Sequence, residues 1–272
     1  MQLLNGPGIF TETISINSSC LYRDVILDFF LPKNVQEPST LSLLLINDGQ
    51  NLEEMNFLTL LESLYAGELI SPLLCVGIHA GKERKMEYGI VSQADYLGRG
   101  AWAGAYADFI FKELLPFIYK NYSIKSFKEK AIAGFSLGGL TALDITLNYP
   151  YEFRKAGIFS GSFWWRSLDQ NDAAYDDDKH RIMQQVIRNG NYSQGLQFFF
   201  QCGNKDETMD RNNNGIIDSI DDTMAVIDEL VAKGYSREKD ICYLEMPDGK
   251  HDVPTWALAM PDFLKWGWGR SQ

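Results

Sequence analysis

The stretch AIAGFSLGGL, residues 131–140, places an apolar run directly before a serine and two glycines. The run at 130–135 has the composition of a buried strand, and residues 137–148 have the pattern of a helix. Glycine destabilises a helix interior, so its use here needs a reason. One reason would be a turn that is too tight for any side chain other than that of the serine. The stretch therefore predicts a strand–turn–helix elbow that exposes Ser136 as a nucleophile. The alternative is a glycine-rich helix start with a structural serine.

Other apolar runs surround this elbow along the whole chain. Two N-terminal segments, 9–17 and 21–32, are expected to pair as antiparallel strands near a sheet edge. Runs with little alternation predict strands covered on both faces, as in a parallel sheet, at 41–50, 73–79, 130–135, 155–161, 196–203 and 241–246. Helical patterns separate them at 54–66, 103–120, 137–148, 173–189, 221–233 and 254–266. The order predicts one α/β domain, residues 1–272, with ligands bound at the carboxyl ends of the strands.

Composition restricts the partners. The chain has 272 residues, 45% of them apolar, and a net charge of −11, which argues against a surface for nucleic acid or anionic membrane. No apolar run approaches the length of a membrane span, and the N-terminus lacks a secretory signal pattern. A cytoplasmic protein is expected, unless a signal has been removed. The scattered cysteines are expected to be free thiols: Cys20, Cys75, Cys202 and Cys242.

A serine nucleophile needs a general base, usually a histidine, and this chain has only three. His180 lies in a charged segment, where a surface role is expected. His79 ends a predicted strand before the nucleophile and could line the site. His251 follows the last predicted strand, where an α/β-hydrolase carries its base. His251 is therefore the expected base, and an ordinary loop histidine is the alternative.

The acid that orients the base should follow the strand at 196–203. Asp206, Glu207 and Asp210 come next in the sequence. Asp206 is preferred because it comes first after the strand-ending glycine and turn, and Glu207 is held in reserve. The expected role of Asp206 is to fix the tautomer of the His251 imidazole and to stabilise the imidazolium.

The tetrahedral intermediate of ester cleavage needs backbone donors for its oxyanion. The N–H of Leu137, which follows the nucleophile, is one expected donor. The second is the N–H of Gln50, after the turn that Gly49 allows. The alternative for the sequence NDGQ is a simple tight turn, which Asp-Gly favours.

Taken together, these segments resemble the esterase D-like branch of the α/β-hydrolases, which includes enterochelin, feruloyl and acetyl-xylan esterases. The resemblance covers roughly residues 20–268 and rests on LLLINDGQN, MEYGI, RGAWAGAYADFIFKELLPFIYKNY, AIAGFSLGGL, GIFSGSFWW, the Asp after FFFQCGN, and DGKHDVPTWALAMPDFLKW. It implies an α/β-hydrolase fold and a triad of Ser136, Asp206 and His251. The segment SGSFWW looks more like the enterochelin-esterase side of the family. No basic cluster suited to a triply charged ferric siderophore accompanies it.

Residues after the strand at 155–161 are expected to shape the substrate pocket. Trp164, Trp165 and Arg166 leave the carboxyl end of that strand, and aromatic walls there would suit an aryl or otherwise apolar ester. His79 is expected to contribute from a neighbouring strand end. Core packing of the tryptophans is the alternative.

The segment DRNNNGIIDSID, residues 210–221, matches a calcium-binding loop. Its expected oxygen ligands are Asp210, Asn212, Asn214, the carbonyl of Ile216, and Asp221. Two asparagines replace aspartates and Asp221 replaces the usual glutamate, so weak binding is expected. The alternative is an Asn-Gly turn followed by a helix with acidic residues at its start. Any calcium would be structural, because the serine mechanism requires no cofactor.

The sequence thus predicts a serine hydrolase that cleaves carboxylic esters of small molecules through an acyl-enzyme. Two alternatives remain open: acyl transfer to an alcohol on the same scaffold, and a non-catalytic binding module derived from a hydrolase. Intact serine, aspartate and histidine argue against the binding module. Neither the natural ester nor the oligomeric state follows from the sequence.

Overall fold

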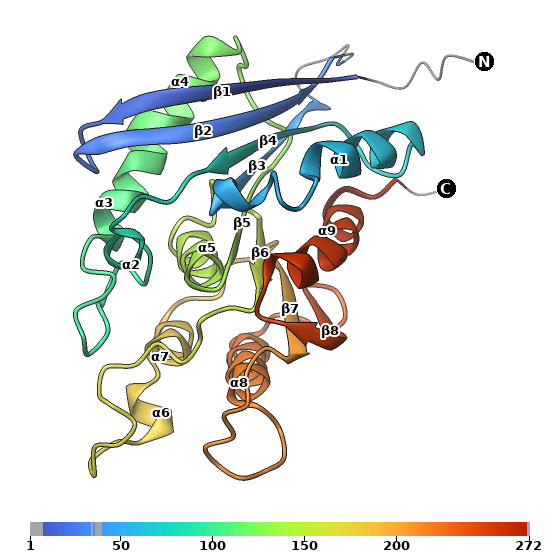
Figure 1. Ribbon diagram of the computed structural model, residues 1–272. Helices are drawn as coiled ribbons and strands as arrows, with labels where there is room; N and C mark the ends of the chain where they lie inside the picture. The colour runs from blue at the N-terminus through green and yellow to red at the C-terminus, as the bar shows by residue number, and fades with distance from the viewer. Residues whose placement is uncertain (1–7, 34, 36–39, 271–272) are drawn as a thin grey trace.

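One mostly parallel sheet organises the protein (Figure 1). The computed structural model describes residues 8–33, 35 and 40–270, and within them eight strands pair in the order β1-β2-β4-β3-β5-β6-β7-β8. The strands are β1 (Ile9–Ser18), β2 (Arg23–Pro32), β3 (Ser42–Asn47), β4 (Leu73–Ile78), β5 (Lys130–Phe135), β6 (Lys155–Phe159), β7 (Gln197–Lys205) and β8 (Ile241–Lys250). The strands β1 and β2 are antiparallel to their neighbours, and β3 to β8 run parallel. This is the predicted α/β-hydrolase arrangement.

Helices cover both faces of the sheet, which explains why its central strands are apolar throughout. Every residue of β3 and β4 is buried, whereas β1 alternates between covered and exposed positions. One core forms against α1 (Phe57–Ala66) and α9 (Val253–Trp268). The opposite core forms against α3 (Ala103–Asp108), α4 (Leu115–Asn121), α5 (Leu137–Asn148), α7 (Ile182–Asn189) and α8 (Asp218–Lys233). The short helices α2 (Arg84–Glu87) and α6 (Asp177–His180) lie in the connections.

Three predicted helices differ from the observed ones. The segment 103–120 is helical, but residues Phe109–Leu114 take π-helical form just before Pro116, which has no N–H for the regular ladder. The segment 173–189 is broken at Arg181, whose extended backbone pairs with Arg166, so only α6 and α7 form. The helix predicted from 54 begins at Phe57.

The four cysteines are free thiols, as predicted. Cys202 and Cys242 lie on neighbouring strands, but the register pairs Cys202 with Glu245 and so separates the two sulfur atoms. No helix in the described part of the chain combines the length and the apolar character needed to cross a membrane.

Helix α5 carries a buried carboxyl that makes stability depend on pH. Asp144 is fully buried and accepts a hydrogen bond from the N–H of Val91 at 3.0 Å. Burial raises the pKa of Asp144 to about 7. The folded state therefore holds a proton that the unfolded chain releases near pH 4, and the contribution of Asp144 to the free energy of unfolding falls as the pH rises from about 4 through 7.

Asp144→Asn is expected to stabilise the protein at high pH, because the amide keeps the acceptor for Val91 and carries no charge. The gain above about pH 7 is at most about 4 kcal/mol, and it shrinks toward pH 4. Thermal denaturation of both proteins at about pH 8 and pH 4 measures it. A stability difference that is equal at the two pH values would contradict the assignment.

Candidate active site

Ser136 stands at the junction of β5 and α5, in the backbone conformation of the predicted elbow. Its φ is 55° and its ψ is −118°, a strained conformation for a residue with a side chain. Close packing explains why Gly134 and Gly138 are glycines. A Cβ on Gly134 would lie 2.4 Å from the carbonyl of Gly138, and a Cβ on Gly138 would lie 2.8 Å from Asp48. Strand and helix therefore pack too closely for side chains, and the turn presents the Ser136 hydroxyl at the strand end.

Asp206 and His251 meet at the same edge of the sheet. Asp206 follows β7, its side chain is fully buried, and its Oδ1 accepts a hydrogen bond from the N–H of Gly203 at 3.1 Å. Its Oδ2 has no hydrogen-bond partner among the described residues and lies 3.9 Å from Nδ1 of His251. The His251 side chain is 38% exposed. The structure thus places a buried carboxylate oxygen beside the predicted base.

Trp256 connects this histidine to the elbow. Its ring packs edge-on against His251 at 5.3 Å and stacks on Phe135, the residue before Ser136, at 5.0 Å. The indole N–H donates to the hydroxyl of Ser160 at 2.9 Å. One buried side chain therefore contacts the candidate base and the strand that carries the candidate nucleophile.

Ser162 is a neighbour of the nucleophile that sequence reasoning did not assign. Its Oγ lies 3.1 Å from Oγ of Ser136, and its N–H donates to the Ser136 carbonyl at 3.2 Å. Within the described residues, no hydrogen bond joins Ser136 to His251. The segment SGSFWW contains Ser162, so a polar residue at a parallel strand end was the available signal.

The two amides predicted for the oxyanion lie at adjacent strand ends. Leu137 begins α5, and Gln50 lies in the short 3-10 turn Gly49–Asn51 that follows β3. Neither N–H donates a hydrogen bond to any residue that the structure describes. Both amides therefore remain able to donate to a bound group.

Asp48 and Arg84 fix the turn that carries Gln50, and neither was predicted from the sequence. The Asp48 carboxylate accepts from Arg84 Nε at 2.6 Å and from Nη2 at 2.7 Å. The same Nη2 donates to the carbonyl of Phe135 at 3.2 Å. This ion pair ties the Gln50 turn to the residue before the candidate nucleophile.

A buried polar chain supports the same turn from beneath. The Tyr106 hydroxyl donates to Asn47 Oδ1 at 2.6 Å, and Asn47 Nδ2 donates to the carbonyl of Gly138 at 2.8 Å. The N–H of Asp48 donates to the Tyr88 hydroxyl at 3.1 Å. Burial raises the pKa of the Tyr88 and Tyr106 hydroxyls above the usual range of tyrosine, so both side chains stay neutral. These contacts hold the end of β3 against α5.

The structure places Trp165 in the core, which corrects its prediction as a pocket wall. The side chain is fully buried, and an added Cβ on Gly89 or Gly100 would lie 2.9 Å or 2.7 Å from its ring. The tryptophan therefore packs beneath the loop that contains both glycines. The alternative of core packing is correct for this residue.

The remaining residues of the predicted pocket are dispersed. Trp164 is partly exposed and lies under the guanidinium of Arg99 at 4.7 Å. Arg166 donates to the carbonyl of Trp164 at 2.7 Å and to Gln170, so it is engaged within its own loop. His79 pairs with Asp28 at 2.5 Å and lines a cavity two strands from the elbow.

The loop 210–221 folds inward on its own polar groups. The Asp210 carboxylate accepts from the N–H of Asn214 at 3.1 Å and of Gly215 at 2.9 Å. The side-chain amides of Asn212 and Asn214 each donate to Asp221 Oδ2 at 2.8 Å. Among the described residues no group of three or more His, Cys, Asp or Glu is placed to hold a metal ion. Calcium binding, with the Ile216 carbonyl as a further ligand, stays a prediction from the sequence.

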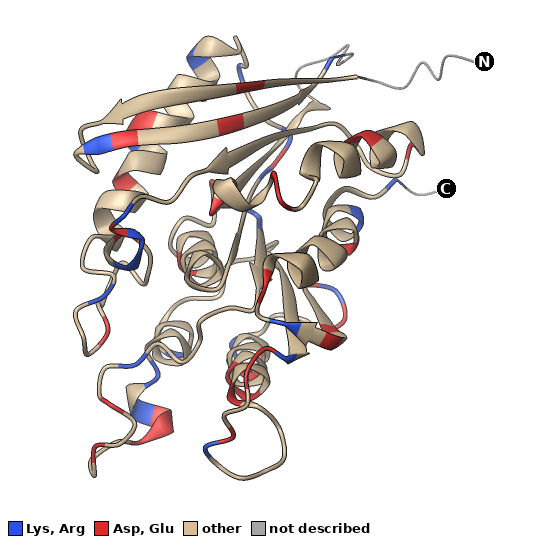
Figure 2. Cartoon of the chain, viewed as in Figure 1, with Lys and Arg blue, Asp and Glu red and all other residues tan. Residues whose placement is uncertain are grey.

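Beside this loop, ion pairs connect the segment of α6 to the loop and to α8. Figure 2 shows acidic and basic residues along both helices. Arg211 pairs with Asp177 at 3.1 Å, and Arg181 pairs with Asp222 at 2.9 Å. Ordering of the loop would therefore stabilise two helices at once.

If the loop binds calcium, millimolar CaCl2 raises the melting temperature by about 2–8 °C relative to EDTA, because the ion binds only the folded loop. Asp221→Ala removes the response, and Asp248→Ala, an exposed aspartate outside the loop, keeps it. Equal melting temperatures with calcium and with EDTA would refute the prediction.

The sheet order and the strained serine at the β5–α5 elbow are those of the α/β-hydrolase fold. The chain belongs to the putative esterase family, whose model matches residues 18–266.

Similarity to individual proteins is more distant. YbbA of Bacillus subtilis (strain 168), an uncharacterized protein, is 30% identical over 127 residues, which are 45% of this chain and 50% of that protein. The enterobactin esterase FES from Shigella flexneri superposes with a TM-score of 0.70 at 20% identity, over 96% of this chain and 61% of FES. An IroE-like serine hydrolase from Shewanella oneidensis superposes with a TM-score of 0.72 at 19% identity, over 95% of this chain and 80% of that protein. The two solved structures support the fold, and the chain spans about half the length of YbbA.

Proposed function

We propose that the protein hydrolyses carboxylic esters of small molecules through an acyl-enzyme on Ser136. One observation carries the proposal: the buried Asp206 carboxylate has a free oxygen 3.9 Å from His251, at the sheet edge where the strained elbow presents Ser136. A buried carboxylate without a partner is costly, and an imidazolium formed during the reaction would compensate it. Membership of the esterase family supports the same reaction.

In the acylation step, Ser136 Oγ forms a bond to the ester carbonyl carbon while its proton passes to Nε2 of His251. The carbonyl electron pair moves onto oxygen, where the free N–H groups of Leu137 and Gln50 donate to the oxyanion. The intermediate then collapses, the carbon–oxygen bond to the alcohol breaks, and His251 returns the proton to the leaving oxygen. Asp206 keeps the proton of His251 on Nδ1 and stabilises the imidazolium throughout.

In the deacylation step, water replaces the alcohol. His251 takes a proton from the water as its oxygen attacks the acyl carbon, and the same proton then returns to Ser136 as the acid leaves. Acyl transfer would differ only in the use of an alcohol here instead of water.

Turnover requires a local closure of the site. The Ser136 hydroxyl must turn from Ser162 toward His251, and the 3.9 Å separation between His251 and Asp206 must shorten to a hydrogen bond. Catalytic hydrogen bonds commonly tighten in this way when substrate binds. The His251 ring is partly exposed and contacts Trp256 on one side.

Hydrolysis of p-nitrophenyl acetate and p-nitrophenyl butyrate by the purified protein tests the proposal. A burst of p-nitrophenol stoichiometric with enzyme, followed by steady turnover, is the expected signature of an acyl-enzyme. Addition of an alcohol shows whether acyl transfer competes. A folded protein that releases no nitrophenol from either ester would favour the non-catalytic binding module.

A further inference from the structure

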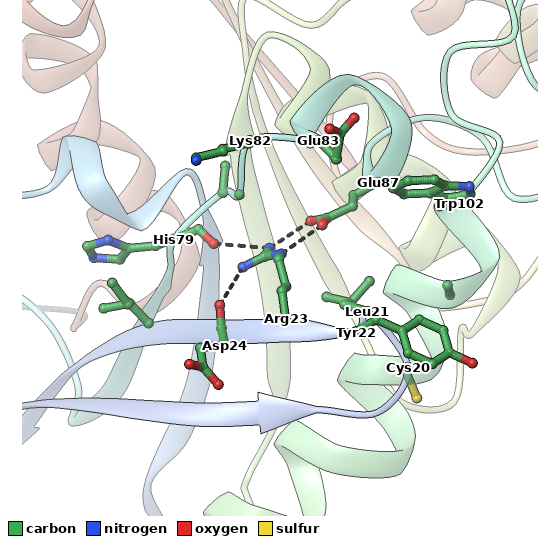
Figure 3. Close-up of a pocket in the computed structure, with 14 residues that line it drawn as sticks. Cys20, Leu21, Tyr22, Arg23, Asp24, His79, Lys82, Glu83, Glu87 and Trp102 are labelled. Atoms are coloured by element: carbon green, nitrogen blue, oxygen red, sulfur yellow. Dashed lines mark hydrogen bonds and ion pairs between the residues drawn. The ribbon is translucent and has the colours of Figure 1, made fainter.

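A concave site lies at the end of β4, two strands from the elbow that carries Ser136. It is a cavity of about 870 Å³, in the size range of small-molecule sites. The β1–β2 turn, the start of β2, the segment after β4 and the start of α3 line it (Figure 3). None of Ser136, Asp206 and His251 is among its lining residues. The esterase mechanism therefore leaves this cavity unexplained.

The turn between β1 and β2, which carries Tyr22 into the cavity lining, is tied to Glu113 through residues 18–20. The Glu113 carboxylate accepts from Ser18 Oγ at 2.5 Å, from the N–H and hydroxyl of Ser19 at 2.9 and 2.7 Å, and from the N–H of Cys20 at 3.1 Å. Tyr22 has a φ of 52° and its side chain is 93% exposed. A left-handed backbone costs a non-glycine residue free energy, and an exposed ring recovers none of it by packing. An aromatic held in this way is suited to contact a ligand.

Trp102 supplies a second aromatic surface to the same cavity. It precedes α3, and its backbone N–H donates to the carbonyl of Met86 at 2.8 Å. Its side chain is 46% exposed. In Figure 3, Tyr22 and Trp102 lie on one side of the cavity and His79 on the other, and Arg23 lies between His79 and the two rings. Both rings line the same cavity, and aromatic rings pair favourably with other flat rings.

The rest of the lining combines aliphatic side chains with charged ones. Its aliphatic members are Leu21, Ile26, Ala80 and Ala105. Apolar walls with few convergent polar groups are typical of small-molecule sites.

The charges of the cavity disfavour an anionic ligand. Arg23 is engaged: Nε and Nη2 donate to Glu87 at 2.7 Å each, and further bonds reach the carbonyls of His79 and Asp24. The second cation of the lining is Lys82. The lining also contains three carboxylates, those of Asp24, Glu83 and Glu87. The carboxylates outnumber the cations, so the cavity repels an anionic ligand.

We propose that this cavity binds a neutral, flat aromatic group of one or two rings between Tyr22 and Trp102. The group can belong to an aryl ester substrate or to a separate aromatic effector. The cavity wall contacts the turn that carries Gln50, because the N–H of Ala80 donates to the side chain of Gln50 at 3.0 Å. The substrate case rests on the proposed esterase function, whereas binding itself does not.

Titration of the Ser136→Ala protein with 2-naphthol by isothermal calorimetry tests binding without turnover. In that background, Tyr22→Ala and Trp102→Ala are each expected to weaken binding about three- to tenfold, through loss of ring contacts. Tyr151→Ala is the matched control, because Tyr151 is 91% exposed and lies outside the cavity. The anion 2-naphthoate, with the same rings, should bind at least about tenfold more weakly than 2-naphthol.

Kinetics then distinguish the two sources. Competitive inhibition of p-nitrophenyl acetate hydrolysis by 2-naphthol assigns the site to the substrate, and a change in kcat at saturating ester assigns it to an effector. The proposal is overturned if 2-naphthol does not bind, if Tyr151→Ala weakens binding as much as Tyr22→Ala, or if 2-naphthoate binds as tightly. A protein that binds 2-naphthol but hydrolyses no ester would refute the esterase function alone.

Discussion

Replacement of Ser136 by alanine is expected to lower kcat/KM for p-nitrophenyl acetate by at least about 10⁴-fold, to the level left by the oxyanion donors and binding alone. No acyl-enzyme can form without the Ser136 hydroxyl, and the neighbouring Ser162 lies on a different strand end with its own backbone geometry. Steady-state release of p-nitrophenol by wild type and variant measures the effect.

Ser136→Ala is expected to leave the melting temperature nearly unchanged. Alanine keeps a Cβ, so the strain of φ 55° persists, and among the described residues the Ser136 hydroxyl makes one hydrogen bond, to Ser162. Ser136→Gly should remove both the activity and the strain, and so melt at a higher temperature. If the folded alanine variant kept more than about a tenth of wild-type activity, Ser136 would not be the nucleophile.

Asp206→Asn is expected to lower kcat/KM by about 10³–10⁴-fold. The amide oxygen can still accept from Gly203, so the loop keeps its position, but the neutral side chain cannot stabilise a protonated His251. The same p-nitrophenyl acetate assay gives the number, and circular dichroism confirms that the variant is folded.

Glu207 provides the matched control for Asp206. It is the next residue along the chain, it is half-buried, and burial raises the pKa of its carboxyl. Glu207→Gln should change kcat/KM by less than about tenfold, because Asp206, not Glu207, is paired with Nδ1 of His251. A larger loss in Glu207→Gln than in Asp206→Asn would transfer the role of the acid to Glu207.

The sequence predicted the features that depend on local order. Alternation of apolar runs and helical patterns predicted the parallel sheet, and the glycines of 131–140 predicted a close strand–helix turn, which Gly134 and Gly138 form. The positions of Asp206 and His251 followed because parallel strands end at one edge of the sheet. Their roles in catalysis stay predictions until the variants are assayed.

Features that depend on contacts between distant segments were beyond this reasoning. Trp165 is buried because Gly89 and Gly100, from a distant loop, make room for its ring. Arg84 joins Asp48 through an ion pair across 36 positions, and NDGQ alone reads as a turn. Neither burial nor pairing of this kind leaves a periodic pattern in one sequence.

The central claim is that Ser136 is a nucleophile activated by His251 and Asp206. Intact-mass spectrometry after treatment with a fluorophosphonate tests it most directly, because only an activated serine reacts covalently. The account predicts one adduct per chain, mapped to Ser136 by peptide sequencing, absent in Ser136→Ala and formed far more slowly in Asp206→Asn. An adduct on another residue, or a folded wild-type protein with no adduct, would contradict it.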